Sequence, residues 1–362
     1  MNRLEPLDGL RGLAVLLVLA SHASNAGLDL APGLHANGLG RPGVFLFFVL
    51  SSFLLTGQLL GRVSQREPIC WRRFAARRLL RIVPAYALTL GVLVALGVMQ
   101  AGPALEHLVL LRAEHHFWTI PVEVLFYLTL PVLVLVLGPL RSPLARIGVL
   151  AAMAIGLRLV FAPDFTSEPP HYRPNVAPFL PIFLVGSALA VGAPYFSKTS
   201  ERTQLVLKLA GTLSAVCLVL LTPSIWGALQ GVPQGTPIEH TRFHLWFDLF
   251  ALLWAAVLVG ALQPSGWLRA VASWAPLRWL GQISYSVYLL HALVLGYFVE
   301  RGGALGLPAG WLGPAFFFAT CAVGAASYWL VERPFLGVLS GRGAGPEAAA
   351  TRSHTTAAPG TD

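Results

Sequence analysis

The sequence predicts an all-α fold: a polytopic membrane helix bundle of about ten transmembrane helices with both termini cytoplasmic. Three observations predict it. Only 11% of the 362 residues are charged, whereas 56% are hydrophobic. The mean hydropathy of +0.68 lies far above that of soluble domains. Apolar stretches of roughly 16 to 21 residues recur along nearly the whole chain, and a helix needs about 20 such residues to cross a bilayer core.

Ten apolar stretches give the expected spans in chain order. The first is too long, and too closely followed by others, to be a cleaved signal peptide. We expect residues 1–339 to form one membrane domain and residues 340–362, rich in Gly, Ala, Thr and Pro, to form a disordered cytoplasmic tail. The expected spans cover residues 8–27, 43–61, 82–100, 117–137, 147–162, 178–194, 205–222, 245–263, 281–299 and 311–331.

Basic residues set the expected orientation, because Lys and Arg accumulate on the cytoplasmic side of membrane proteins. With the N-terminus in the cytoplasm, 19 of the 25 Lys and Arg residues fall on inner segments. Seven of the ten histidines, among them His115 and His116, fall on the outer side. Removing one span would destroy this alternation, so both termini are expected in the cytoplasm.

The net charge of +9 and the three cysteines show whether the chain resembles a nucleic-acid-binding, a disulfide-linked or a metal-binding protein. A basic chain can indicate nucleic-acid binding, but here the distribution of Arg follows membrane topology, so no nucleic-acid partner is expected. Cys70, Cys217 and Cys321 show neither metal-ligand spacing nor a disulfide framework. We therefore expect free thiols and no metal site.

Arg11 and His22 are the most informative pair, because ionisable side chains inside a membrane span indicate function. Eleven helical steps place them on one face, about 16 Å apart along the helix axis. Glu123, Arg158 and His291 are expected at a depth similar to that of His22, in the outer half of the membrane. Four such groups at one depth favour a shared polar cavity over four separate accidents.

His22 can act as a general base near neutral pH, and a nearby carboxylate would fix its tautomer and stabilise the imidazolium. Glu123 is the candidate carboxylate, and Tyr127, one helical turn further on the same face, could position it. The alternative is a His–Glu hydrogen bond that only joins two helices. The alignment of His22 with Arg11 favours a functional role.

The run RRFAARRLLR at residues 72–81 is the strongest basic segment. Positive-inside topology or contact with anionic lipid explains most of it. Arg78 and Arg81 are three residues apart, so they share a helical face and can bind phosphate together. With Arg11 they could hold a phosphorylated donor at the cytoplasmic face. The sequence contains no GxxxxGK[ST] phosphate loop, so nucleotide hydrolysis is not indicated.

Six short motifs follow one another between residue 4 and about residue 336. They are LDGLRGLAVLLVLASH with Arg11 and His22, FFVLSSFLL with Ser52, RRLLRIVPAY with Arg78, Arg81, Pro84 and Tyr86, HFWTIPVEVLFY with Trp118, Thr119, Glu123 and Tyr127, ISYSVYLLH ending at His291, and YWLVERPF with Glu332 and Pro334. In this order the motifs resemble those of the acyltransferase 3 family of integral membrane O-acyltransferases. Ser52 and Thr119 depart from the family pattern, which usually has Gly and Ser there. Ser52 adds a side chain where the family often lets helices approach closely.

The resemblance implies transfer of an acyl group, commonly acetyl from acetyl-CoA, to a hydroxyl of a carbohydrate or glycosylated acceptor, with no permanently bound cofactor. Acyl-CoA would bind from the cytoplasm with its phosphates on the three arginines, and its pantetheine arm would reach His22, the catalytic base, which Glu123 supports. A covalent acyl-histidine relay is the alternative to direct attack. His291, Tyr127 and Arg158 are expected to bind the acceptor or to steady the oxyanion.

The rival class is a transporter or exporter of a glycan or lipid-linked sugar, because transporters also carry intramembrane His, Glu and Arg. Such proteins often contain inverted repeats with broken helices in matching positions. The sequence shows no convincing internal repeat, which favours a multi-pass enzyme of the cell membrane. A non-catalytic scaffold would not need clustered ionisable groups. The acceptor, the acyl chain length and the oligomeric state stay open.

Overall fold

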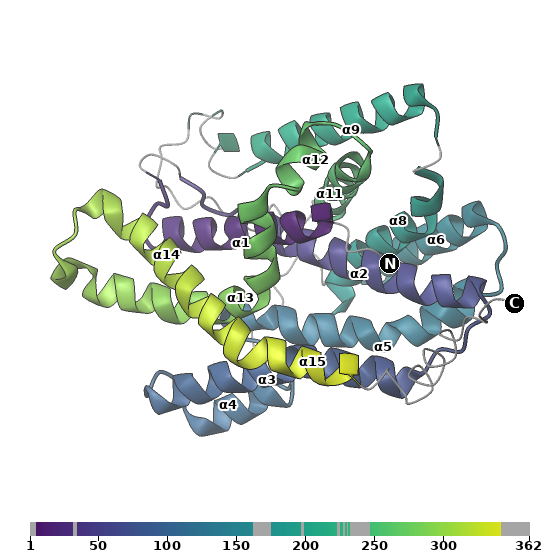
Figure 1. Cartoon of the computed structure of the whole chain (residues 1–362). Helices are drawn as coiled ribbons and strands as arrows, with labels where there is room; N and C mark the ends of the chain where they lie inside the picture. Colours follow the sequence, from purple (N-terminus) through teal and green to yellow (C-terminus); the bar gives the residue numbers. More distant parts are fainter. Residues whose placement is uncertain are drawn as a thin grey trace, which may run out of the picture.

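The computed structural model describes residues 5–31, 35–161, 175–196, 199–222 and 247–341, together with residues 225, 226, 229 and 231. Throughout these ranges the regular structure is helical and no strand occurs, so the predicted all-α fold is confirmed (Figure 1). The long helices are α1 (Glu5–Asn25), α2 (Gly40–Ser64), α3 (Trp71–Ala95), α5 (Thr119–Leu137), α6 (Pro143–Val160), α8 (Leu180–Phe196), α9 (Glu201–Leu220), α11 (Phe247–Leu262), α13 (Ala275–Arg301) and α14 (Ala309–Ser327).

Shorter helical segments connect or extend these long helices. The α-helical ones are α4 (Ala101–Leu108), α12 (Trp267–Ala272) and α15 (Arg333–Gly341). The 3-10 turns are η1 (His115–Trp118), η2 (Ala177–Phe179) and η4 (Gly302–Leu305). One π-helical turn, η5 (Tyr328–Glu332), lies between α14 and α15, and its buried Glu332 accepts a hydrogen bond of 3.1 Å from Ser286 of α13.

Nine helices in the described part of the chain are long and apolar enough to cross a membrane, and α11 is a shorter apolar helix of 16 residues. Many large apolar side chains point away from the protein interior, such as Leu144, Leu159 and Leu135, which are 80%, 77% and 74% exposed. Lipid tails solvate such side chains as well as a protein core does, so these surfaces face the bilayer. The protein is therefore a multi-pass membrane protein.

Helix α1 runs through the middle of the bundle, packed against α13 and α2, while α3 with α4 and α9 lie towards opposite edges (Figure 1). Glycines let α1 and α13 approach backbone to backbone. A Cβ atom added at Gly281 would lie 1.8 Å from the carbonyl oxygen of Asp8, and one at Gly12 would lie 2.0 Å from that of Leu277. Small residues at a membrane helix interface allow this close packing. The packing holds the His22 face of α1 against the His291 face of α13.

Ser52 shows how the departure from the family pattern is accommodated. Its hydroxyl is fully buried and donates to the carbonyls of Phe48 and Val49 one turn back in α2. A Cβ added at Gly186 of α8 would lie 2.0 Å from the Ser52 hydroxyl oxygen. The facing helix therefore supplies the space that the serine occupies.

Eight of the ten expected spans agree with the structure to within four residues at each end. The ninth helix begins earlier, at Ala275 instead of residue 281, and the third covers residues 71–95 instead of 82–100. The third helix begins earlier because Arg, Ala and Leu are good helix formers, so residues 72–81 continue the apolar segment as helix. It ends earlier because Gly97 adopts a φ of +71°, with its amide bonded to the carbonyl of Val94. Most of the expected tail, residues 342–362, lies outside the described residues.

Candidate active site

A cavity of about 340 Å³ lies among α1, α2, α3, α5 and α13 and is here named the arginine cavity. Arg11 of α1 and Arg78 and Arg81 of α3 line it. Arg78 and Arg81 are one helical turn apart and so face the same way. The structure thus brings the three predicted arginines together at one cavity.

Part of the hydrogen-bonding capacity of Arg78 is left for a ligand. The Nε atom of Arg78 is buried and has no partner within the described residues. Its guanidinium carbon lies 5.9 Å from the ring centroids of both Phe74 and Tyr127, at cation–π distance. Arg11 has a carboxylate oxygen of Asp8 at 3.9 Å from its Nη1 atom. A guanidinium carries five N–H donors, which suit phosphate or carboxylate oxygens.

Glu123 belongs to the arginine cavity and not to His22, which corrects the predicted pairing of the two. Its Oε1 atom accepts hydrogen bonds of 2.9 Å from Ser51 of α2 and 2.6 Å from Tyr127. The expected contact between Glu123 and Tyr127 is therefore present. The predicted pairing failed because depth along a helix does not say which way its side chains point.

A second cavity, of about 380 Å³, lies between α1, α2, η1 and α13 and is here named the histidine cavity. Its lining includes His22 of α1 and, from η1, His115, His116 and Trp118. Arg41 of α2 lines it as well. The imidazole of His22 therefore faces a space that a small part of a substrate could occupy.

The two cavities adjoin, because Val44 of α2 and Tyr288 of α13 line both of them. Arg11 lies at one cavity and His22 at the other, on the same continuous helix α1. Eleven residues of helix separate them, about 16 Å along the axis. The predicted alignment of guanidinium and imidazole along one helix is present in the structure.

The ring partner of His22 is His291. The His22 Nδ1 atom lies 2.7 Å from His291 Nε2, and the His291 Nδ1 atom lies 2.6 Å from the carbonyl oxygen of Tyr288. A carbonyl oxygen only accepts, so His291 Nδ1 carries the proton that it donates to Tyr288. Neutral His291 then accepts at Nε2, and His22 must donate from its Nδ1. The lone pair of neutral His22 is left on Nε2, the nitrogen that a base uses.

His116 packs against the ring of His291, a contact that sequence reasoning missed. Its ring centroid lies 4.7 Å from that of His291, and its Nε2 lies 3.1 Å from the carbonyl oxygen of Leu289. No group of three or more His, Cys, Asp or Glu side chains in the described ranges has an arrangement that could hold a metal ion. One signal in the sequence pointed to His116, because it is the first residue of the motif HFWTIPVEVLFY, which also contains Glu123.

Tyr288 fixes the junction of the two cavities. Its hydroxyl donates a hydrogen bond of 2.5 Å to the carbonyl oxygen of His116 and accepts one of 3.0 Å from Thr119. Both partners belong to the η1–α5 segment, so the tyrosine ties α13 to this segment. Thr119, the second departure from the family pattern, retains the hydroxyl that serine would supply.

Arg158 lies elsewhere, which corrects its expected place beside His22. Its Nε donates to a carboxylate oxygen of Asp248, so the pair connects α6 to α11. Arg158 lines neither the arginine cavity nor the histidine cavity. The contact with Asp248 gives this intramembrane arginine a structural explanation, since buried charges in membranes pair with one another.

The sequence is similar to known acyltransferases over most of its length. Residues 5–333 match the acyltransferase 3 family, described as "Acyltransferase domain". The chain is 27% identical over 321 residues to the peptidoglycan O-acetyltransferase OatA of Listeria monocytogenes, covering 79% of this chain and 48% of that protein. It is 27% identical over 368 residues to YrhL of Bacillus subtilis, a provisionally named peptidoglycan O-acetyltransferase, covering 91% of this chain and 54% of that protein.

A provisionally named O-acetyltransferase of Staphylococcus aureus is 24% identical over 335 residues, which cover 82% of this chain and 51% of that protein. The chain thus spans about half the length of the curated relatives it matches. No solved structure matches the chain.

Proposed function

The chain belongs to the acyltransferase 3 family, and on that premise we propose that it is a membrane O-acetyltransferase that moves an acetyl group from acetyl-CoA to a hydroxyl of a cell-surface carbohydrate. The names of the relatives support acetyl as the group and a peptidoglycan-like glycan as the acceptor. The observation that carries the proposal is the meeting of the arginine cavity and the histidine cavity at Val44 and Tyr288.

The arginine cavity suits the CoA half of the donor. Acetyl-CoA is anionic at its nucleotide end and carries its thioester at the end of a long pantetheine arm. Arg11, Arg78 and Arg81 offer charge-assisted hydrogen bonds to the phosphates. The arm would then run along α1 towards Val44 and Tyr288, and its length is about the separation of Arg11 from His22. In this proposal CoA enters from the side expected to be cytoplasmic.

The histidine cavity suits the reacting hydroxyl. In this proposal His22 Nε2 takes the proton of the acceptor hydroxyl while the hydroxyl oxygen attacks the thioester carbonyl carbon. The tetrahedral intermediate collapses, the C–S bond breaks, and the departing sulfur takes the proton back from His22. The products are the acetyl ester and CoA. Because His291 accepts from His22 Nδ1, the lone pair of neutral His22 lies on Nε2 both before the proton is taken up and after it is returned.

The positions of Glu123 and Tyr127 also indicate a role for these two side chains in the proposed reaction. Glu123 and Tyr127 act on the donor side, where the carboxylate balances the charge of the arginines and fixes the Tyr127 hydroxyl.

A covalent acetyl group on His22 Nε2 is the alternative chemistry, in which the hydroxyl attacks the acetyl-imidazole in a second step. Single-turnover experiments without acceptor distinguish the two, because only the second route releases CoA.

The test is transfer of isotopically labelled acetyl from acetyl-CoA by the full chain in membrane vesicles, with a soluble peptidoglycan fragment as acceptor. We expect the fragment to gain one acetyl unit by mass spectrometry, and His22→Ala to reduce the rate by a factor of about 10² to 10⁴. His35→Gln is the control, since His35 pairs with Asp29 and lines neither cavity. Movement of the unmodified fragment across the vesicle membrane, with no acetyl transfer, would instead indicate a transporter.

A further inference from the structure

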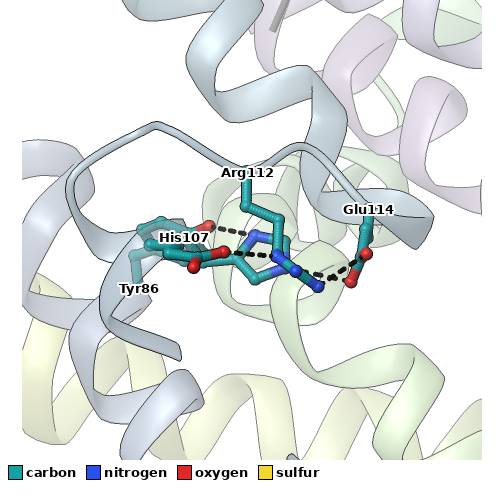
Figure 2. Close-up of polar contacts among 5 residues, drawn as sticks. Tyr86, His107, Arg112 and Glu114 are labelled. Atoms are coloured by element: carbon teal, nitrogen blue, oxygen red, sulfur yellow. Dashed lines mark hydrogen bonds and ion pairs between the residues drawn. The ribbon is translucent and has the colours of Figure 1, made fainter. Parts of the chain in front are cut away.

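Five polar side chains between α3 and η1 form a connected chain, here named the polar clip: Tyr86, Glu106, His107, Arg112 and Glu114 (Figure 2). Arg112 is at its centre. Its Nε donates to Glu106 and its Nη1 donates to Glu114, each at 2.7 Å. The other carboxylate oxygen of Glu114 lies 3.9 Å from His107 Nε2, and His107 Nδ1 lies 3.3 Å from the Tyr86 hydroxyl oxygen.

The clip joins three consecutive parts of the chain. Tyr86 lies on α3, Glu106 and His107 on α4, and Arg112 and Glu114 on the segment that leads into η1. Tyr86 and His107 are 1% and 0% exposed, so one end of the clip is fixed in the protein interior. The Arg112 end is partly exposed. Charge-assisted hydrogen bonds of this length are the strong ones, so the clip holds the segment to α4.

The segment needs such a restraint because its backbone is strained. Leu110 and His115 adopt φ values of +63° and +50°, in the left-handed region that side chains other than glycine rarely enter. Arg112 and Glu114 lie between these two residues. Strained backbone persists only where surrounding contacts determine it, and the two carboxylate contacts of Arg112 do so here.

The strained segment ends in the histidine cavity. His115 and His116 line that cavity, the ring of His116 contacts that of His291, and the carbonyl of His116 accepts the hydrogen bond of Tyr288. The position of these groups therefore depends on the segment that the clip restrains. None of the clip residues lines either cavity.

We propose that the polar clip positions His115 and His116 in the histidine cavity, with Arg112 as the positioning residue. The proposal deepens the proposed function, since it assigns the clip to the acceptor side of the reaction. Releasing the clip would let the strained segment relax and move both histidines, while the arginine cavity on the other side of Tyr288 keeps its form.

The groups that face His107 give the clip a dependence on protonation. They are Tyr86, Glu106, Arg112, Glu114 and His115. Burial lowers the pKa of His107 below its ordinary value of 6.5, although Glu114 opposes this shift. The hydrogen bonds to Glu106 and Glu114 raise the pKa of Arg112, so the arginine stays charged. The folded clip therefore prefers neutral His107, with Arg112 as its only cation.

The experiment compares Arg112→Gln and Arg112→Lys with Arg301→Gln, a change of an exposed arginine at the end of α13. Hydrogen exchange of residues 109–118, read by mass spectrometry on the full chain, is the first measurement. We expect Arg112→Gln to speed exchange there about tenfold, Arg112→Lys to restore part of the protection, and Arg301→Gln to change nothing. Unchanged exchange in Arg112→Gln would overturn the proposal.

Steady-state kinetics with acetyl-CoA and a soluble peptidoglycan fragment is the second measurement. We expect Arg112→Gln to lower kcat/KM for the fragment about tenfold and to leave the KM for acetyl-CoA unchanged. Equal losses on both substrates would show general unfolding and refute a positioning role. If the wild-type chain transfers no acetyl group, the proposed function fails, but the exchange measurement still decides whether the clip restrains the segment.

Discussion

The arginine cavity and the histidine cavity adjoin, yet their polar groups are arranged in opposite ways. In the arginine cavity, the buried Nε of Arg78 has no hydrogen-bond partner in the described structure, so this donor is available to an anionic ligand. In the histidine cavity, the nitrogens of His291 and the Nδ1 of His22 are already hydrogen-bonded to each other or to a carbonyl. Of the four nitrogens of these two rings, His22 Nε2 is the one left for chemistry within the described structure. One cavity is built to bind charge, and the other is built to fix a proton.

Breaking the proton arrangement should have the largest effect. In His291→Phe no acceptor remains for His22 Nδ1, so the tautomer of His22 is no longer set, and we expect kcat to fall about 100-fold. His291→Gln keeps an amide oxygen that can accept, and should retain more activity. Acetyl-CoA binding, measured by calorimetry, should be unchanged in both. Equal kcat values for the two variants would contradict the assigned hydrogen bond.

The binding arrangement should respond differently to substitution. Arg78→Ala should raise the KM for acetyl-CoA about tenfold with little change in the KM of the acceptor, because it removes charge-assisted hydrogen bonds to the donor. Arg77→Ala is the matched control, since Arg77 is its neighbour in the same basic run and does not line the arginine cavity. If Arg77→Ala raises the KM for acetyl-CoA to the same degree, the basic run at residues 72–81 acts through its overall charge. That result would favour the positive-inside interpretation of the run.

The pH dependence sharpens the comparison on the histidine side. The pKa of His107 is lowered by burial, so an open clip binds a proton more readily than a closed one. The clip is therefore fully stable above the ordinary value of 6.5 and weakens as the pH falls towards the lowered pKa. We expect the KM for the acceptor to rise about threefold when the pH falls from about 7.5 to about 5.5.

The glutamine in His107→Gln cannot take up a proton, so the rise of the acceptor KM on acidification should disappear. Acid should still lower kcat in this variant, because protonated His22 cannot act as the base. The KM for acetyl-CoA should not follow the titration of His107 in either protein. An acceptor KM that still rises on acidification in His107→Gln would assign the effect to another group.

The smallest effect is expected at neighbouring serines. Ser51→Ala removes one of the two hydrogen bonds to Glu123, and because water can replace it in the cavity, the KM for acetyl-CoA should rise only about twofold. Ser52→Ala should leave that KM unchanged, because the Ser52 hydroxyl bonds to its own helix. A larger rise of this KM in Ser52→Ala than in Ser51→Ala would show that the serines of the FFVLSSFLL motif act through helix packing and not through Glu123.

The sequence predicted most of the fold, because apolar length and the distribution of charge are local properties that a helix bundle in lipid must satisfy. It placed Arg11, Arg78 and Arg81 correctly as a group because they lie near the expected inner ends of spans. The direction of Glu123 could not be predicted, since it depends on how α5 is rotated about its axis. The places of His116 and Arg158 depend on a strained loop and on Asp248, two features of tertiary structure that no short pattern records.

In the proposed mechanism the acetyl group passes between the two cavities at Val44 and Tyr288. Val44→Phe adds bulk at this junction, whereas Val44→Ala removes it, and thermal unfolding of both variants serves as the check on folding. The decisive measurement is acetyl transfer alongside acetyl-CoA binding in these two proteins. We predict that Val44→Phe binds acetyl-CoA normally but transfers acetyl at least about 100-fold more slowly, while Val44→Ala stays active. Transfer at the wild-type rate in a folded Val44→Phe protein would contradict the claim.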